Sequence, residues 1–388
     1  MIYVAAILAV MSCAAWVYLV FFHGGFWRST LSANELPNPD LPEWPDVLVV
    51  IPARNEADVI SRTVLSLQQQ DYSRPVSIVL VDDNSNDGTA AIARAAAEEA
   101  GHADRLAVVD GAPLAPGWTG KVWAMAQGVA HADSIAPQAR YILFSDADIE
   151  HAPSNLRRLV HTAETEGKDL VSIMVMLMTK GFWERFLIPP FVFFFQMLYP
   201  FSRVNDDTRD TAAAAGGCML VRRSALHRSG GMDAIKGALI DDCALARSLA
   251  DAGGRLSLSL DAKTRSTRPY GGFSGIWNMV ARSAYTQLRY SPWLLMGCIM
   301  GMALVYGVPL LVVLAFGWLA PITVLAGLAT YILMCVAYIP TLRLYDRPLY
   351  TAVFMPLAGM LYTAMTISSA VRHWRGVGGG WKGRVYQQ

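Results

Sequence analysis

The chain has 388 residues, of which 54% are hydrophobic and only 16% are charged, and its formal net charge is +1. Such a weak net charge gives no electrostatic basis for binding nucleic acid, and an apolar excess of this size is atypical of a wholly soluble protein. The apolar residues gather toward the two ends of the chain. This distribution indicates a membrane protein with a polar middle.

Residues 1–22 carry no charged side chain, and a helix of that length can cross a hydrocarbon core of about 30 Å. Arg28 follows this stretch, whereas a cleaved signal peptide would have a basic start and a shorter apolar run. We therefore expect a retained anchor, with the N-terminus outside and the following residues in the cytoplasm. A Pro-rich polar linker is expected over residues 23–46.

From Val47 onward, short apolar runs alternate with helical patterns. Helices are expected at about residues 56–70, 90–100 and 121–130. The runs VLVVIPA, VSIVLVDD, LAVVDG and YILFSDAD are typical of strands buried on both faces. This alternation predicts an α/β domain with a mostly parallel, doubly wound sheet over residues 47–290. In such sheets, ligands bind beyond the carboxyl ends of the strands.

Two of these strands end in paired carboxylates, Asp82 and Asp83 in one case and Asp146 and Asp148 in the other. We expect at least three of the four to face one cleft, although Asp82 and Asp83 alone fit a strand-end cap equally well. Two carboxylates as close as Asp146 and Asp148 repel each other unless a cation lies between them or one takes up a proton. Mg²⁺ uses one or two protein carboxylates and completes its shell with water and phosphate oxygens. The pair therefore predicts a divalent metal site, for Mg²⁺ or Mn²⁺, and a diphosphate substrate.

A third acidic pair, Asp241 and Asp242, lies in the segment LIDDCALA, where apolar residues at helical spacing follow it. Acidic residues at a helix start are favoured by the helix dipole, so the pair has a purely structural interpretation. Its functional interpretation is a general base, because a carboxylate near the cleft can take a proton from an attacking hydroxyl.

The motifs VVIPARNEADVI, VLVDDNSNDGTA, ILFSDADI and IDDCALA resemble, in this order, those of the inverting family 2 glycosyltransferases, which have a GT-A fold. The resemblance covers roughly residues 47–289. It implies that Asp146 and Asp148 form the metal and diphosphate motif. It also implies that Asp242 is the catalytic base, with Asp241 in place of the family's glutamate. The nucleotide-binding residues that it implies are Pro52, Ala53, Arg54, Glu56, Asp82 and Asp83.

A closer likeness covers nearly the whole chain. Segments such as GAPLAPGWTGKVWAMAQG, TAAAAGGCMLVRR and RHWRGVGGGWKGRVY are similar to those of the hopene-associated glycosyltransferases of bacterial hopanoid gene clusters. Ceramide glucosyltransferases are wider relatives. The resemblance implies a nucleotide-sugar donor, with a UDP-sugar as the first expectation, and a lipid acceptor such as a hopanoid. It further implies a multi-pass enzyme of the bacterial inner membrane whose catalytic domain faces the cytoplasm.

Polysaccharide synthases and ceramide glucosyltransferases carry a Gln/Arg-x-x-Arg-Trp motif that contacts the diphosphate and the acceptor. The corresponding region here reads ARSAYTQLRYSPW and lacks the Arg-Trp pair, which argues against a long-chain polysaccharide synthase. Arg282 or Arg289 would neutralise the leaving phosphates, unless these residues simply flank a membrane helix. Lys121, in WTGKVWAM, is either a further phosphate contact or a solvated surface residue.

The segment at residues 180–201 contains Pro189 and Pro190 and many aromatic residues. We expect it to be interrupted by the prolines and to lie in the membrane interface, or else to be a buried core helix. Residues 291–371 hold three more apolar stretches, and a basic tail at 372–388 is expected in the cytoplasm. Three full crossings would place that tail outside, against the charge rule. Either the rule fails here, or the last stretch, which Pro356 interrupts, lies in the interface or re-enters, and we expect the second.

Together these features predict an inverting, metal-dependent transferase that moves a sugar from a nucleotide diphosphate to a lipid hydroxyl. Two alternatives remain open. One is a glycosyltransferase whose acceptor is polyprenyl phosphate, which is already ionised and needs no base. The other is an inactive membrane scaffold or lipid-binding protein that keeps the fold, although an idle site has no reason to hold so many facing carboxylates.

Overall fold

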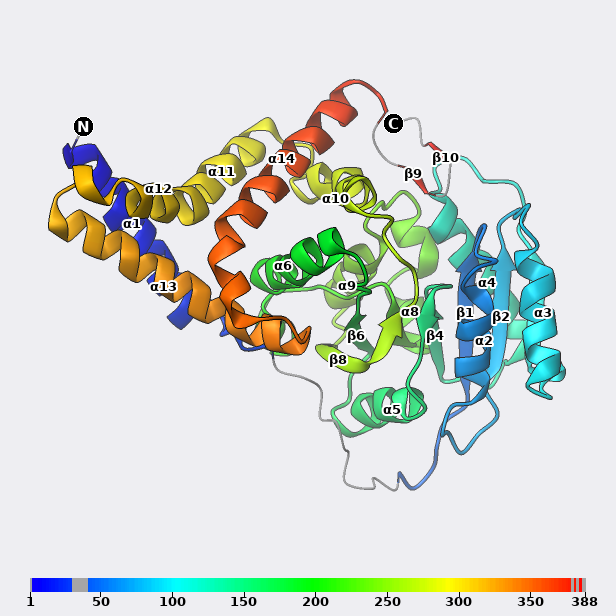
Figure 1. Ribbon diagram of the computed structural model, residues 1–388. Helices are drawn as coiled ribbons and strands as arrows, with labels where there is room; N and C mark the ends of the chain where they lie inside the picture. Colours follow the sequence, from blue (N-terminus) through cyan, green and yellow to red (C-terminus); the bar gives the residue numbers. More distant parts are fainter. Residues whose placement is uncertain (1, 30–40, 378–379, 382–383, 386–388) are drawn as a thin grey trace.

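The computed structural model describes residues 2–29, 41–377, 380–381 and 384–385. Residues 30–40 of the expected linker and part of the basic tail at 372–388 lie outside the described residues. Figure 1 shows a sheet covered by helices on one side of the molecule and a group of long helices on the other, with α6, α10 and α14 between them.

The sheet has eight strands in the order β3-β2-β1-β4-β7-β6-β8-β5. The first four strands in this order are parallel to one another, as predicted. β7 is antiparallel to both β4 and β6, and β5 is antiparallel to β8, so the sheet is mixed. The strands are β1 Val47–Ala53, β2 Ser77–Asp82, β3 Leu106–Asp110, β4 Tyr141–Ser145, β5 Ile149–Glu150, β6 Leu170–Met176, β7 Cys218–Arg222 and β8 Leu256–Ser266.

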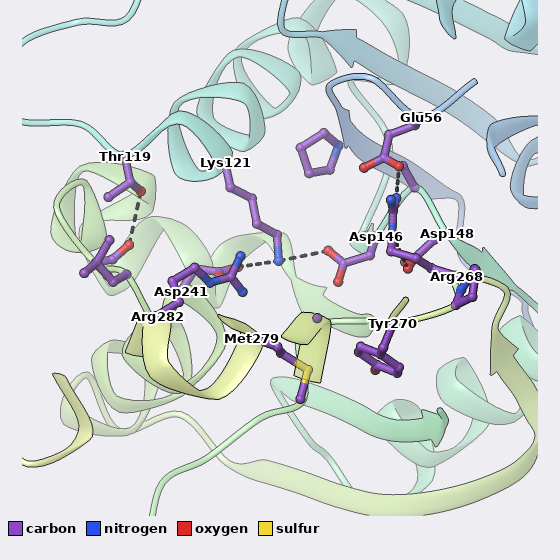
Figure 2. A pocket seen from close by; sticks show the side chains of 16 residues that line it. Glu56, Thr119, Lys121, Asp146, Asp148, Asp241, Arg268, Tyr270, Met279 and Arg282 are labelled. Carbon is purple, nitrogen blue, oxygen red and sulfur yellow. Dashed lines mark hydrogen bonds and ion pairs between the residues drawn. The ribbon is translucent and has the colours of Figure 1, made fainter. Parts of the chain in front are cut away.

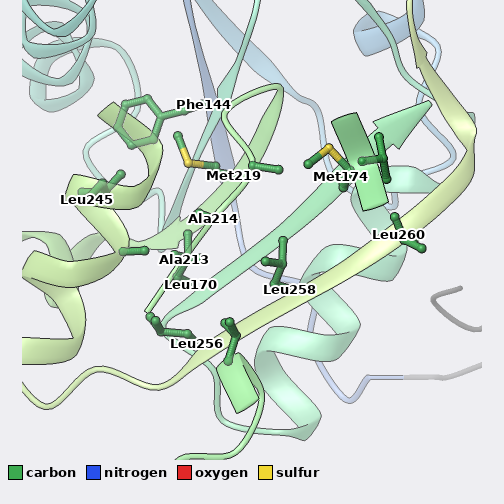
Figure 3. Packing of buried hydrophobic residues seen from close by; sticks show 14 of the residues in the cluster. Phe144, Leu170, Met174, Ala213, Ala214, Met219, Leu245, Leu256, Leu258 and Leu260 are labelled. Atoms are coloured by element: carbon green, nitrogen blue, oxygen red, sulfur yellow. The ribbon is translucent and has the colours of Figure 1, made fainter. Parts of the chain in front are cut away.

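The central strands are buried on both faces, which explains why they are apolar without alternation. In β1, Leu48 and Val50 belong to one hydrophobic core, whereas Val47, Val49 and Ile51 belong to the other. Successive strand residues point to opposite faces, so each strand supplies both cores. Figure 3 shows the first core around β4, β6, β7, β8 and α9. The helices of the domain are α2 Ile60–Gln68, α3 Thr89–Glu99, α4 Gly120–Ile135, α5 Asn155–Thr165, α8 Arg223–Arg228, α9 Asp241–Asp251 and α10 Phe273–Gln287.

Helix α2 begins four residues later than predicted, because the segment before it is bound to the turn after β2. The amide of Asn55, whose φ is 51°, donates to Ser85 Oγ over 2.9 Å. The amide of Glu56 donates to Thr89 Oγ1 over 2.8 Å. These backbone groups are therefore satisfied by side chains from another strand end, and the residues form a loop at the edge of the sheet.

Among the residues that the structure describes, four helical segments are long and apolar enough to cross a membrane, in the regions where the sequence predicts membrane segments. The first is α1 Ile2–Phe21, and the third is α13 Pro321–Leu344, which packs against α1. The second segment consists of α11 Pro292–Met302, η4 Ala303–Gly307 and α12 Val308–Leu314, and the last of η6 Leu349–Phe354 and α14 Met355–Trp374. The short remaining elements are η1 Phe26–Arg28, η2 Ala103–Arg105, α7 Phe201–Val204, η3 Gly231–Ile235, η5 Phe316–Trp318, β9 Gly380–Trp381 and β10 Arg384–Val385.

Prolines do not interrupt the two segments where the sequence suggested it. Pro356 lies in the first turn of α14, directly after the 3₁₀ helix η6, so the segment changes its type of helix there without a break. Helix α6, Phe182–Leu198, runs continuously through Pro189 and Pro190, which are buried. Tyr362 of α14 donates a hydrogen bond to the carbonyl of Leu187 beside this pair, over 2.7 Å. Packing between α6 and α14 thus supports the helix where the prolines weaken it.

Candidate active site

A cavity of about 430 Å³ lies beyond the carboxyl ends of β1 and β4, where an α/β sheet binds its ligands. Figure 2 shows the charged side chains that converge on it from several elements. The residues of its lining that the sequence predicted as site residues are Pro52, Glu56, Lys121, Asp146, Asp148, Asp241 and Arg282. The lining residues that the sequence did not single out include Thr119, Arg268, Tyr270 and Met279.

Lys121 joins two of the predicted acidic groups. Its Nζ lies 2.8 Å from Asp146 Oδ1 and 2.9 Å from Asp241 Oδ2. Burial alone would lower the pKa of Lys121, but these two carboxylates raise it above its usual value. Lys121 is the second residue of α4 and Asp241 the first of α9, so two helix N-termini border the cavity here. An ammonium group and two helix starts make this end of the cavity suited to an anion.

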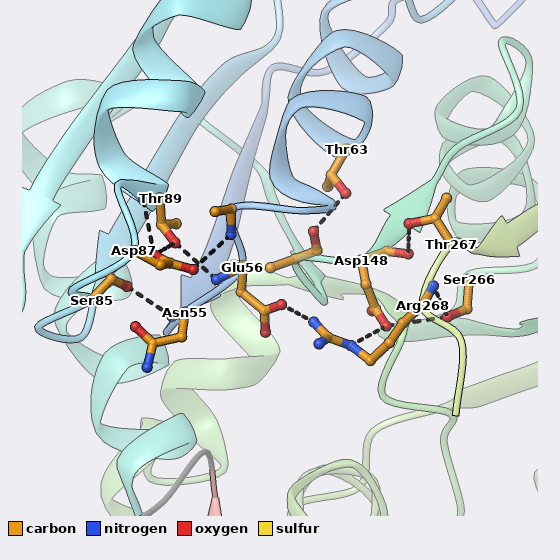
Figure 4. A network of polar contacts seen from close by, with 12 residues as sticks. Asn55, Glu56, Thr63, Ser85, Asp87, Thr89, Asp148, Ser266, Thr267 and Arg268 are labelled. Atoms are coloured by element: carbon orange, nitrogen blue, oxygen red, sulfur yellow. Dashed lines mark hydrogen bonds and ion pairs between the residues drawn. The ribbon is translucent and has the colours of Figure 1, made fainter. Parts of the chain in front are cut away.

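Arg268 holds the other end of the acidic pair. Its Nε lies 3.1 Å from Asp148 Oδ2, and its Nη2 pairs with Glu56 (Figure 4). Ser266 Oγ donates to the same Asp148 oxygen over 3.2 Å. Burial and the charge of Asp146 raise the pKa of the Asp148 carboxyl to about 6. Asp146 and Asp148 are therefore close enough to repel each other, as expected.

Asp241 and Asp242 begin helix α9, as predicted, but they are placed differently. Asp241 lines the cavity, whereas Asp242 is half-buried and is not part of the lining. The amides of Gly216 and Cys243 donate to the two Asp242 oxygens over 2.8 and 2.7 Å. Leu245, one turn further on, is buried in the core shown in Figure 3 and so fixes the start of α9.

The surroundings of Asp242 raise the pKa of its carboxyl. Burial raises the pKa of its carboxyl to about 6, the charge of Asp241 adds to the rise, and Lys121 opposes it. A Cβ atom built on Gly216 would lie 3.2 Å from Asp242 Oδ2 and 3.4 Å from Lys121 Nζ, so all three meet at one point. A carboxylate with a pKa near 6 is ionised at neutral pH and is still basic enough to accept a proton in a reaction.

The expectation that three of the four strand-end aspartates share one cleft is wrong. Of the four, only Asp146 and Asp148 line the cavity. The third aspartate in the lining is Asp241, which begins a helix and does not end a strand. Asp82 and Asp83 are buried at the end of β2, where Asp82 Oδ1 accepts from the Ser85 amide over 3.0 Å. Their position fits the strand-end alternative, because β2 lies one strand further from the cavity than β1, and their contact with a nucleotide stays a prediction.

Three further predicted residues do not line the cavity. Arg54 pairs with Asp83, its Nη1 lying 3.5 Å from Asp83 Oδ2, and Ala53 is fully buried in β1. Arg289 is exposed in the turn after α10, with φ at 50°, and its amide bonds the Thr286 carbonyl. Helix α10 ends at Gln287, so the chain has turned away before Arg289, and only Arg282 of the two predicted arginines reaches the lining.

The donor set for a metal consists of Asp146 and Asp148. In the described part of the chain, no three His, Cys, Asp or Glu side chains come together in a group that could hold a metal ion. Two carboxylates with a raised pKa on one of them nevertheless fit Mg²⁺ or Mn²⁺, which take their other ligands from phosphate and water. Both carboxylates have a protein cation beside them, so a metal ion would compete with Lys121 and Arg268.

Comparisons with known proteins agree with this fold. The family model described as glycosyl transferase family 2 matches residues 48–230, and the one described as glycosyl transferase family group 2 matches residues 141–367. The mannosyltransferase PcManGT from Pyrobaculum calidifontis, solved in complex with GDP-Man and Mn²⁺, is 20% identical with a TM-score of 0.56. That likeness covers 96% of this chain and 99% of the other, and it shows that the two share a fold.

Among curated proteins, the 4,4'-diaponeurosporenoate glycosyltransferase of Staphylococcus aureus (strain MRSA252) is 30% identical over 200 residues. The match covers 51% of this chain and 49% of that protein, so the chain spans about half the length of the curated relatives it matches.

The mixed sheet has the GT-A fold, and the family models show a glycosyltransferase. The chain belongs to glycosyl transferase family group 2, whose model matches more than half of it.

Proposed function

We propose that this protein transfers a sugar from a nucleotide-diphosphate donor to the hydroxyl group of a membrane lipid. The observation that carries the proposal is the cavity itself. Three carboxylates from β4 and α9 face two helix N-termini and the cations Lys121, Arg268 and Arg282, next to helices long enough to cross a membrane. Such a site can hold a diphosphate and withstand the charge that develops when it leaves.

In the proposed mechanism, Asp242, whose Oδ2 meets the cavity-lining Lys121 at Gly216, removes the proton from an acceptor hydroxyl that reaches past the lining. The acceptor oxygen then attacks the anomeric carbon from the face opposite the nucleotide, so the bond to the phosphate oxygen breaks and the configuration inverts. Asp242 is preferred to Asp241 as the base because the ammonium of Lys121 neutralises Asp241 directly. The two backbone amides that hold Asp242 fix the direction of its carboxylate.

The leaving nucleotide requires positive charge. Lys121 and Arg282 line the cavity from α4 and α10, and each can contact a phosphate oxygen. Asp146 and Asp148 would hold a divalent cation, which would neutralise the phosphates as the bond to the sugar breaks. The Mn²⁺ complex of the Pyrobaculum calidifontis mannosyltransferase, which shares the fold, supports this use of the acidic pair.

The lipid acceptor follows from the helix that forms the opposite wall. Gly275, Met279 and Arg282 of α10 line the cavity, and the same helix packs along α14, an apolar helix. Trp277 of α10 donates to Ser368 Oγ of α14 over 3.1 Å. A lipid lying beside α14 can therefore present its hydroxyl to the cavity while its apolar body stays in the bilayer. The carotenoid-type substrate named for the Staphylococcus aureus relative supports an apolar acceptor, and we propose a hopanoid-like lipid.

The proposed setting is a bacterial inner membrane, with the α/β domain in the cytoplasm, where nucleotide sugars are made. The exposed aromatic residues at the start of α6, among them Phe182 at 72% exposure, support an interfacial position for that end of the helix.

The proposal is tested with the full-length protein in liposomes, given radiolabelled UDP- or GDP-sugars and a polycyclic lipid alcohol. We expect label to enter the lipid extract with the wild type and with Asp251→Asn, a control at the exposed end of α9. Asp146→Asn should lower the transfer about 100- to 1,000-fold. If no nucleotide sugar is consumed with any acceptor, the inactive scaffold would replace the proposed enzyme.

A further inference from the structure

Arg268 ties together three strand ends that lie far apart in the sequence. It follows β8 by two residues, and it pairs with Glu56 of the loop after β1 and with Asp148 after β4 (Figure 4). Its side chain is 35% exposed and lines the cavity, whereas Glu56 is almost fully buried, with 6% of its side chain exposed.

The two ion pairs of Arg268 differ in what they do. A buried carboxylate such as Glu56 is costly without a positive partner, so this pair anchors the guanidinium from behind. The backbone at Asp148 is already held without Arg268, because the amide and the hydroxyl of Thr267 donate to the Asp148 carbonyl over 2.8 and 3.0 Å. The contact with the Asp148 carboxylate is therefore not needed to fix the strand end.

The loop that carries Arg268 is fixed on both sides of it. On one side, Thr267 is bonded to Asp148. On the other, the amide of Tyr270 donates to Oε1 of the buried Glu184 over 2.8 Å, which ties the loop to the start of α6. Only Arg268 and Pro269 lie between these bonds, and both line the cavity. The guanidinium can thus change partner without movement of the backbone.

We infer that Arg268 is a donor-phosphate ligand, which exchanges the Asp148 carboxylate for the terminal phosphate of the nucleoside diphosphate while Glu56 keeps hold of it. This rests on the proposed function. A guanidinium has five N–H donors in a planar fork, so it can bind a phosphate through two of them and still pair with Glu56. No bond is made or broken in this exchange, which changes only the ionic partner of Arg268.

The experiment compares UDP with UMP, in calorimetric titrations of the full-length protein in detergent at constant Mg²⁺. Arg268→Gln should weaken UDP binding by about 10- to 100-fold and change UMP binding less than about twofold, because only UDP carries the second phosphate. Arg268→Lys keeps the charge without the fork and should give an intermediate loss. Arg265→Gln, an exposed arginine on the same strand, should change neither affinity.

Two results would overturn the inference. Equal losses of UDP and UMP affinity in Arg268→Gln would assign Arg268 a structural role. Unchanged affinities in Arg268→Gln and Arg268→Lys would remove Arg268 from the donor site. The same titrations with GDP and GMP cover a guanine donor. If the wild type binds no nucleoside diphosphate at all, the proposed function itself fails. That outcome differs from equal UDP affinities of the wild type and Arg268→Gln, which would contradict only the role of Arg268.

Discussion

The two walls of the cavity are built in opposite ways. The wall that carries Asp146 and Asp148 extends from β4, a strand fully buried between two hydrophobic cores. The opposite wall is α10, a helix that lies between the α/β domain and the apolar helix α14 (Figure 1). A packed sheet fixes charged groups precisely, whereas a helix beside the membrane presents an apolar surface to a lipid. The difference indicates that donor chemistry and acceptor recognition can be changed separately.

The largest separable effect should come from the sheet wall. Asp146→Asn and Asp148→Asn each remove a charge that the proposal places at the diphosphate, and we expect transfer to fall about 100- to 1,000-fold. Initial rates at saturating acceptor would measure this loss. If either variant kept the wild-type rate and raised only the acceptor KM, the assignment of this wall to the donor would be wrong.

Overpacking should destabilise both the α/β domain and the group of long apolar helices. A Cβ at Gly128 would collide with Val50, between α4 and β1, and a Cβ at Gly327 would collide with Val312, between α13 and α12. Gly128→Ala and Gly327→Ala should each lower the free energy of unfolding by about 1–3 kcal/mol. Gly301→Ala, where a Cβ meets nothing within 4 Å, is the control. Thermal unfolding in detergent measures all three, and unchanged melting of Gly128→Ala would show that α4 packs less tightly on the sheet.

The pH dependence should report on Asp242. A base must be ionised, so transfer should fall about tenfold per pH unit below its pKa of about 6 and level off above it. Asp241→Asn removes a negative charge that raises this pKa, so the acid limb should move to lower pH in the residual activity. The pKa of Asp148 is also about 6 but has burial and Asp146 as its causes, so an acid limb that stays in place would assign the titration to Asp148.

The smallest effect should come from the helix wall. Met279→Ala removes an apolar contact from the α10 side of the cavity, and we expect the acceptor KM to rise about fivefold while the affinity for UDP stays the same. Met296→Ala, at an exposed position on α11, is the matched control. A weaker UDP affinity in Met279→Ala would show that Met279 serves the donor, as Arg282 of the same helix is proposed to do, and not the acceptor.

The sheet wall was more predictable from the sequence than the helix wall, for a physical reason. Asp146 and Asp148 end an uninterrupted apolar strand, and the position of such a residue at the edge of a parallel sheet follows from strand geometry alone. Lys121 and Asp241 also follow from local pattern, because each begins a helix that the sequence indicates.

Arg268 and Met279 had weaker signals. Arg268 follows a strand as Asp146 does, but only the tertiary pairing of β8 with β5 and β6 brings it to Asp148. The sequence offered Arg282 or Arg289 as the phosphate contact and could not choose between them, because the turn of the chain at the end of α10 depends on tertiary structure. The half-buried position of Asp242 behind Asp241 likewise depends on the packing of Gly216, which no local pattern reveals.

The most direct test of the account compares Asp242→Asn with Asp241→Asn, measuring sugar transfer and UDP binding on the same preparations. We predict that Asp242→Asn lowers transfer by about 100- to 10,000-fold and keeps UDP affinity within severalfold, whereas Asp241→Asn retains measurable transfer. If Asp242→Asn instead transferred sugar within tenfold of the wild-type rate, the account would be contradicted, and an acceptor that is already ionised, such as a polyprenyl phosphate, would take the place of the lipid hydroxyl.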